Sequence, residues 1–397
     1  MRLILFTGKG GVGKSSMAAA TAARAADLGA KTLVVSSDLA HNLTDILGNN
    51  VGEETVQITK NLFALEVDVL AEIRRNWSSM QEYLAGLMSY LGVDDAVAEE
   101  AALIPGIEEF FLLERIRREV EDGDYDNVVV DCSPTGGTLR LLTLSDSSAK
   151  NFQKIIDMER LFLKLVRPFT NRIKSVKPII PKDELYDSFG ELIVGVGRLG
   201  ELLKDVEKSS VRLVLTPERV AVAETKRAFT YLSLFGFNVD AVLINKIFPK
   251  EVSEGYFAPW QKLQQEQIGV VDKSFLDTPI FQVPYLDGEP IGVDKLAQLG
   301  KSIYGESKPN EVYAKRRTVV IDKEDEHTCL SFHVPNMDKQ ELDIGRKGND
   351  LFITAGGHRR IFALPDSLTD CEIGGAKFDE GRLKVIFHRR KAGAGAA

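Results

Sequence analysis

The glycine-rich segment GKGGVGKS at residues 8–15 limits the fold of this chain more than any other feature. It follows a short apolar run at residues 3–7 and precedes an alanine-rich stretch at residues 16–28, so it joins a predicted strand to a predicted helix. Glycines in such a loop let backbone N–H groups converge on a phosphate, while Lys14 reaches the terminal phosphates and the Ser15 hydroxyl ligates magnesium. The segment therefore predicts a phosphate-binding P-loop.

Short apolar runs recur between helical stretches throughout the first 305 residues. The runs of strand length cover residues 3–7, 32–36, 127–131, 211–216, 241–245 and 280–283. Strands that alternate with helices and are apolar throughout indicate a mostly parallel sheet that is covered on both faces. We therefore predict a doubly wound α/β domain over residues 1–305.

Two long helical inserts interrupt this alternation, at about residues 70–121 and 148–207. Their apolar side chains recur at a spacing of three and four, which places them on one face of each helix. They are Ile73, Trp77, Met80, Leu84, Leu87 and Leu91 in the first insert and Phe152, Ile155, Met158, Phe162, Leu165 and Phe169 in the second. Such stripes either pack within the protein or form a groove for another helix, and the basic helix around residues 160–177 could also lie on an anionic membrane surface.

The pattern changes after a polar segment at residues 306–317, which we interpret as a linker. Residues 318–390 hold short β-like runs separated by turn-forming residues, and no helical period continues there. We predict a small all-β sandwich domain, followed by a disordered tail at residues 391–397.

Composition excludes several classes of protein. Fifty Lys and Arg residues stand against 58 Asp and Glu, a net charge of −8, so nucleic acid is not an expected partner. The three cysteines form no CxxC pair, and neither a zinc site nor a disulfide framework is predicted. Because the chain shows neither a leader segment nor an apolar run of about 20 residues, we expect a cytoplasmic protein.

Two acidic residues follow predicted strands at the edge where the P-loop lies. Asp38 comes after the second strand, where a carboxylate can orient a water molecule for attack on the γ-phosphate or can cap a helix. The nearby His41 is more simply a loop histidine than a catalytic group. Asp131 ends the run at residues 127–131, the usual position of the acid that holds the magnesium shell. The glycine-containing loop after it is a candidate switch that senses the γ-phosphate.

A second lysine inside the loop, Lys9, is similar to that of the deviant Walker A P-loop shared by the ArsA, MinD and nitrogenase iron-protein class, although it could also be a solvated loop lysine. The chain further resembles the ArsA family, and within it the Get-pathway ATPases that carry tail-anchored membrane proteins. The residues that carry this resemblance are DLAHNLTD at 38–45, PGIEEF at 105–110 and DCSPTGGTLR at 131–140.

The resemblance implies an ATP hydrolase with an ATP and Mg²⁺ site and assigns roles to its residues. Lys9 would act across a dimer on the partner's nucleotide, Lys14 would act on the bound phosphates, and Asp38 would activate water. Ser15, and Asp131 through a water molecule, would hold magnesium. The implied nucleotide-binding residues are Gly8, Gly10, Gly11, Val12, Gly13, Lys14, Ser15, Ser16, Asn245, Pro284 and Tyr285, the last three near adenine. Because the chain has a single P-loop, a homodimer would supply the second site.

The sequence departs from the family pattern at three places. Leu39 replaces a proline of the first switch and Gly137 replaces a histidine often found in the second, which leaves the switch mechanics open. The zinc-binding CxxC of the eukaryotic targeting ATPases is missing, so dimerisation must rest on other contacts. The C-terminal domain is similar to the α-crystallin domain of small heat-shock proteins, on VPNMDKQELDI at 334–344, FALP at 362–365 and AKFDEGRL at 376–383.

Three functions fit these features. The leading hypothesis is a Get-like ATPase whose hydrolysis gates the binding of hydrophobic helices, with a tail-anchored client and a membrane receptor as partners. The second is the ATPase subunit of an arsenite-efflux pump, against which the scattered positions of Cys132, Cys329 and Cys371 argue. The third is a MinD-like nucleotide-switched scaffold, which would be favoured if the apolar stripes were buried.

Overall fold

The computed structural model describes residues 1–36, 42–72, 75, 107–132, 194–195, 197–252, 254–323 and 327–389. The chain divides into two compact units. The first holds Met1–Glu66, Tyr125–Pro134 and Leu202–Ala397, and the second holds Val67–Asp124 and Thr135–Glu201. The predicted P-loop therefore belongs to the first unit.

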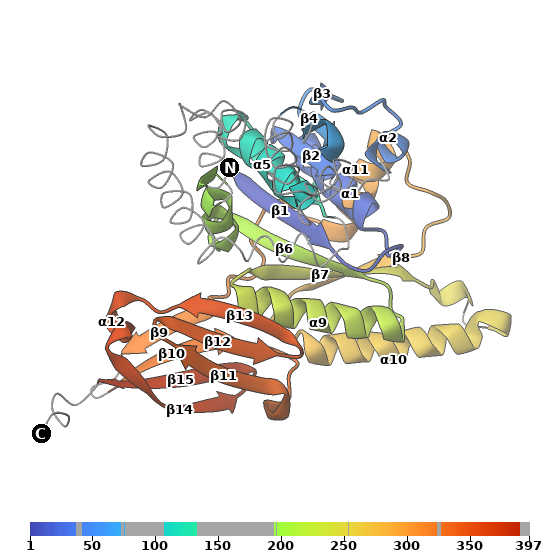
Figure 1. Ribbon diagram of the computed structural model, residues 1–397. Coiled ribbons are helices and arrows are strands. Elements are labelled where there is room, and N and C mark those ends of the chain that lie inside the picture. The colour runs from blue at the N-terminus through green and yellow to red at the C-terminus, as the bar shows by residue number, and fades with distance from the viewer. Residues whose placement is uncertain are drawn as a thin grey trace, which may run out of the picture. The chain divides into compact units, whose positions relative to one another are not determined.

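A central sheet organises the first unit (Figure 1). Among the described residues its eight strands follow the order β3-β4-β2-β5-β1-β6-β7-β8. The strands are β1 (Arg2–Thr7), β2 (Thr32–Ser36), β3 (Val56–Gln57), β4 (Leu62–Glu66), β5 (Asn127–Asp131), β6 (Ser209–Leu215), β7 (Val239–Ile247) and β8 (Ile280–Pro284). Neighbouring strands run parallel, except that β3 is antiparallel to β4. The predicted mostly parallel α/β sheet is confirmed, and β3 and β4 extend it at one edge.

Burial explains why the inner strands are mostly apolar. Every residue of β1, β2, β5 and β6 is buried, as expected when both faces of a parallel sheet are covered. The chain builds one side of the sheet from β2 to β5 and the other side from β6 to β8, with β1 between them. The carboxyl end of β1 is therefore where the strand order reverses, the position at which open α/β sheets bind ligands.

The helices around the sheet are α1 (Lys14–Asp27), α2 (Asn42–Leu47), α9 (Arg219–Phe235), α10 (Ala258–Ser274) and α11 (Val293–Tyr304). Two of them, α1 and α11, pack closely against each other. The buried face of α1 is mostly alanine, which lets α11 approach its backbone. A Cβ atom at Gly300 of α11 would lie 2.4 Å from the Ala20 carbonyl oxygen and 2.6 Å from the Arg24 Cβ. Only glycine fits this contact.

A Gly300→Ala substitution should therefore destabilise the protein, although alanine is the better helix former. Because the added methyl group meets backbone that cannot rotate away, we expect a loss of about 2 to 3 kcal/mol in the free energy of unfolding, measured by urea denaturation. Gly269→Ala in α10 is the matched control, since a Cβ there meets no atom within 4 Å. It should leave stability unchanged or raise it by up to about 1 kcal/mol. Equal effects of the two substitutions would contradict this packing.

Two antiparallel sheets form the C-terminal part of the chain. In the described residues, one sheet has the order β14-β15-β10-β9 and the other β11-β12-β13. The elements are β9 (Val319–Lys323), β10 (His327–His333), β11 (Leu342–Lys347), β12 (Asp350–Ala355), β13 (His358–Ala363), α12 (Asp366–Thr369), β14 (Cys371–Asp379) and β15 (Arg382–Arg389). Alternate side chains of β10, β12 and β15, such as Phe332, Ile353 and Phe387, are fully buried. The predicted all-β domain is confirmed.

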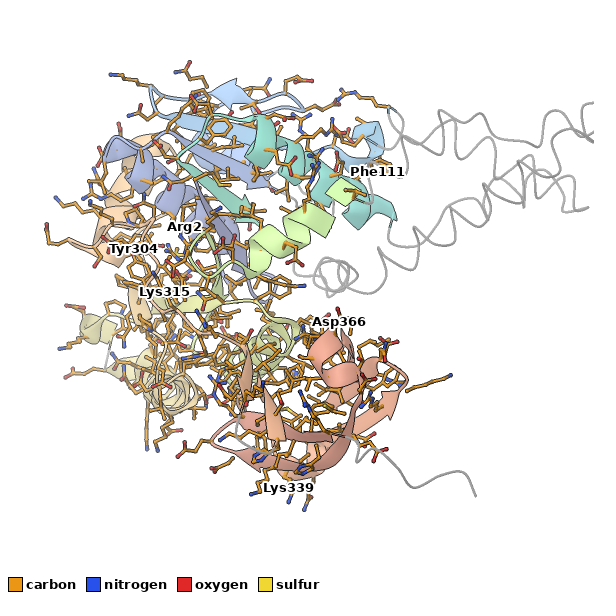
Figure 2. All side chains as sticks on the ribbon, turned by 90° about the vertical axis from the view of Figure 1, so that its left-hand side faces the viewer. Arg2, Phe111, Tyr304, Lys315, Lys339 and Asp366 are labelled. Carbon is orange, nitrogen blue, oxygen red and sulfur yellow. The ribbon has the colours of Figure 1, made fainter. Side chains whose placement is uncertain are left out.

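The segment expected to be a linker is bound along the first unit. The Arg212 guanidinium of β6 donates to the Glu311 carbonyl oxygen at 3.1 Å, and the Asn238 amide donates to the Ala314 carbonyl oxygen at 2.8 Å. The Tyr313 ring lies 4.8 Å from the buried Arg212 guanidinium. Figure 2 shows Lys315, which pairs with Glu207, in this region. Residues 306–317 thus connect the two domains, but the segment is docked on the first unit by these contacts.

Helix α9 holds the β domain directly. The Thr230 hydroxyl of α9 bonds to the Pro335 carbonyl oxygen, and the Arg360 guanidinium of β13 donates to the Leu234 carbonyl oxygen. The Phe229 ring meets the His333 ring edge to face at 5.8 Å. The β domain is therefore fastened to the nucleotide-binding fold both by α9 and by the docked segment.

The second unit contributes α5 (Ile107–Asp122) and a buried ionic cluster. Glu72 is 3% exposed and receives hydrogen bonds from Arg115, at 3.3 Å, and from Arg118. These bonds tie the start of the unit to α5. All twelve residues of the predicted apolar stripes lie outside the described residues, so the groove expected there stays a prediction.

Candidate nucleotide site

The predicted P-loop follows β1, and its last two residues, Lys14 and Ser15, are the first two residues of α1. Three of its glycines have a positive φ: Gly8 at 156°, Gly11 at 81° and Gly13 at 93°. A Cβ atom at Gly8 would lie 2.1 Å from the Val214 carbonyl oxygen, so β6 leaves no room for a side chain there. The loop thus brings its backbone to the N-terminus of α1, where free N–H groups and the helix dipole favour an anion.

Lys14 and Lys9 differ in their burial within this loop. Lys14 is 7% exposed, and its ammonium donates to the Lys9 carbonyl oxygen at 3.4 Å. A lysine folded over its own loop in this way is positioned to exchange that oxygen for phosphate oxygens. Lys9 itself is half-buried, as are Ser15 and Ser16 in the first turn of α1. The predicted phosphate-binding residues are therefore together at one place.

Asp131 ends β5 directly beside the loop. Its register pairs it with Phe6 of β1 on one side and with Ser36 of β2 on the other, and it is 1% exposed. Burial, and then the charge of Asp131, raise the pKa of the neighbouring Cys132 thiol to about 12, while Lys14 acts in the opposite direction. The thiol therefore stays protonated near neutral pH.

Ser15 and Asp131 fit a magnesium ion by chemistry and position. Mg²⁺ prefers oxygen ligands and keeps several of its waters, which suits one hydroxyl and a nearby carboxylate. Ser15 lies in the first turn of α1, and the buried Asp131 carboxylate lies at the end of a strand adjacent to β1. These two residues would hold the ion, which when bound neutralises phosphate charge.

The ends of β7 and β8 supply the opposite side of the loop. The Asn245 amide donates to the Val12 carbonyl oxygen at 2.8 Å, and a Cβ atom at Gly13 would lie 2.4 Å from the Asn245 Nδ2. The backbone N–H of Tyr285 donates to the Ile247 carbonyl oxygen at 2.8 Å, which sets Pro284 and Tyr285 beside this strand end. The structure thus brings the three predicted adenine-contacting residues to the loop side of the sheet.

A carboxylate that the sequence analysis did not single out holds the helix in which the first-switch segment ends. Glu66, at the end of β4, is 3% exposed and accepts bonds from the Thr44 backbone N–H at 3.0 Å and the Thr44 hydroxyl at 3.1 Å. Thr44 lies in α2 (Asn42–Leu47) and within the segment DLAHNLTD at residues 38–45, which resembles the first switch of the family. Recognising β4 as a strand would have placed Glu66 at the same edge as Asp131.

The switch residues themselves lie outside the described residues. These are Asp38, Leu39 and His41 of the first switch and residues 133–140 of the second, including Gly137. The described chain ends before these first-switch residues at Ser36 of β2 and resumes after them at Asn42, where α2 begins.

The fold and the loop define a P-loop nucleotide hydrolase. Residues 1–305 match the model of the anion-transporting ATPase family, ArsA_ATPase, and residues 325–387 match that of the HSP20-like domain found in ArsA. The chain belongs to the ArsA ATPase family, and its activity is that of an ATP hydrolase. The expected ArsA-type domain and the small heat-shock-like β domain are both confirmed.

The relatives of this chain include arsenical pump-driving ATPases and get3 ATPases. The chain is 34% identical to a putative arsenical pump-driving ATPase of Chlorobaculum tepidum, over 99% of this chain and 97% of that one. It is 31% identical to putative arsenical pump-driving ATPase 1 of Aquifex aeolicus, over 98% and 100%. It is 28% identical to ATPase get3 of Aspergillus terreus, over 75% of this chain and 88% of that one. Within the described ranges, the helices are all too short or too polar to cross a bilayer.

Proposed function

We propose that this chain is a cytoplasmic, homodimeric ATPase in which hydrolysis gates the binding of hydrophobic helices, such as the membrane segments of tail-anchored proteins. The proposal of a dimer rests on the presence of two lysines, Lys9 and Lys14, in one P-loop. Lys14 is buried over its own loop, whereas Lys9 is half-buried at the edge of the site. The chain has a single P-loop, whose own phosphates Lys14 can bind. Lys9 is therefore available to act on the nucleotide of a second copy of the chain, and the Lys9 of that copy would act on this one.

In this proposal each residue of the site has its own role in ATP binding or hydrolysis. Loop N–H groups and Lys14 bind the phosphates, and Ser15 and Asp131 hold Mg²⁺. Asp38 orients the attacking water from the first switch, and Lys9 of one subunit stabilises the charge that develops on the other subunit's phosphate. The likeness to ATPase get3 over 88% of that chain supports the client class, and a membrane receptor would release the client.

A second function, the ATPase subunit of an arsenite-efflux pump, is favoured by the names of the full-length relatives. It needs thiolates that a metalloid can reach. Cys132, Cys329 and Cys371 are all buried, and the Cys132 thiol has a raised pKa. These observations favour the helix carrier over metalloid activation. A MinD-like scaffold would bind partners without carrying a client.

Co-expression with a C-terminal transmembrane segment tests the proposal. We expect to recover a soluble complex of chain and segment, and we expect ATP to alter its yield, because hydrolysis opens and closes the site. A segment of equal length with alternating Asp and Lys is the control and should not co-purify. Recovery of no complex while the chain stays soluble, together with ATPase activity stimulated by arsenite or antimonite, would replace the carrier with the pump.

A further inference from the structure

One residue behind the P-loop, Lys246, has an unusual backbone conformation. Lys246, the residue after Asn245, has a φ of 57° although it is not glycine, and the pairing of β7 with β8 shifts register between Ile244 and Ile247. A left-handed backbone costs an ordinary residue stability and persists only where its surroundings enforce it. Here the Lys246 N–H donates to the Asn245 Oδ1 at 2.8 Å.

A glutamine of α10 fixes this conformation from the other side. Gln264 is 9% exposed, and its Nε2 donates to the Lys246 carbonyl oxygen at 3.0 Å. Its Oε1 accepts from the Phe248 N–H at 2.9 Å. One buried amide thus spans the irregular part of β7 and satisfies two backbone groups that the sheet leaves unpaired.

The result is that two consecutive carbonyl groups of the P-loop are held from behind. The Lys246 ammonium donates to the Gly11 carbonyl oxygen at 3.0 Å, and the Asn245 amide donates to the Val12 carbonyl oxygen at 2.8 Å. In a planar trans peptide the C=O of one residue and the N–H of the next point in opposite directions. Holding these two oxygens therefore aims the N–H groups of Val12 and Gly13 away from β7, toward the phosphate side.

We propose that Lys246, held by Gln264, is a positioning residue for ATP: with Asn245 it braces the carbonyl side of the P-loop so that the loop amides are set for phosphate before ATP arrives. The hydrogen bonds also polarise the two peptide groups and make their N–H groups better donors. The inference rests on ATP binding at this loop, and not on what hydrolysis drives.

Lys246→Gly separates this role from a merely structural one. Glycine adopts the left-handed conformation without strain, so the melting temperature should be unchanged or higher. Loss of the charged hydrogen bond should nevertheless weaken the binding of a fluorescent ATP analogue about tenfold. Lys250→Ala, at an exposed lysine nearby, should change neither quantity. Unchanged affinity of Lys246→Gly for the analogue would overturn the proposal.

Gln264→Leu tests whether the two residues act together. It should weaken ATP binding severalfold, whereas Gln265→Leu at its exposed neighbour should not. In the Lys246→Gly/Gln264→Leu double variant we expect no loss of ATP affinity beyond that of Lys246→Gly, because both substitutions disrupt the same contact with the P-loop. Fully additive losses would show that Gln264 acts independently of Lys246.

Tripolyphosphate, which has no base, distinguishes the brace from an adenine contact. If Lys246 acts through the phosphate loop, its Gly variant should lose affinity for tripolyphosphate and for ATP by the same factor. A loss for ATP with none for tripolyphosphate would assign the segment to adenine recognition and overturn the proposal. Competition against the fluorescent analogue measures both ligands with the same protein.

Discussion

An Asp38→Asn variant should bind ATP as tightly as the unaltered chain and hydrolyse it at least about a hundredfold more slowly. Asp38 follows the end of β2 by two residues, and β2 ends at Ser36, in register with the buried Asp131. A carboxylate at this edge can accept a proton and orient water toward the γ-phosphate. Asparagine keeps the shape of the side chain but loses its charge and its basicity. Phosphate release and equilibrium nucleotide binding measure the two quantities separately.

Two control variants bracket the result expected for Asp38→Asn, one that loses ATP binding and turnover and one that loses neither. Lys14→Ala should lose both binding and turnover, because Lys14 is buried in the loop that receives the phosphates. Asp343→Asn makes the same chemical change at an exposed site in β11 of the β domain and should leave both unchanged. Normal hydrolysis by Asp38→Asn would remove Asp38 from the chemistry.

The second large effect is expected at Lys9. Lys9→Ala should retain most ATP binding, since Lys14 stays in place, and should lose about a thousandfold in turnover. The physical reason is that a cation supplied from a partner subunit acts on charge that develops only in the transition state. Lys60→Ala, at an exposed lysine in the turn before β4, is the control. Wild-type turnover by Lys9→Ala would reduce Lys9 to a solvated loop residue.

Local chemistry explains which parts of the site the sequence predicted. The P-loop was predictable because its glycines, Lys14 and Ser15 stand together between one strand and one helix. The position of Asp131 was predictable because it closes a short, valine-rich run, which is typical of a buried strand. By contrast, β4 was missed because its run Leu62–Glu66 continues without a turn signal into further apolar residues, and Glu66 was missed with it.

Contacts between distant residues account for what could not be predicted. Lys246 and Gln264 are 18 residues apart, and their bond exists only because α10 packs beside the end of β7. Arg212 occupies a strand position in which sequence alone suggests exposure, yet it is fully buried against Asp240 at 3.3 Å and the Tyr304 hydroxyl at 3.0 Å. The polar segment at residues 306–317 is docked for the same reason.

The central claim, that two copies of this chain complete each other's ATP sites, is tested most directly by mixing two inactive variants. Lys9→Ala and Lys14→Ala chains carrying different tags are co-expressed, and dimers that contain one of each are isolated by two successive affinity steps. In such a dimer the Lys9→Ala subunit keeps its own Lys14 and receives Lys9 from its partner. We predict about half of the wild-type rate per dimer, since one of two sites works. No recovery of activity, or no mixed dimer, would contradict the claim.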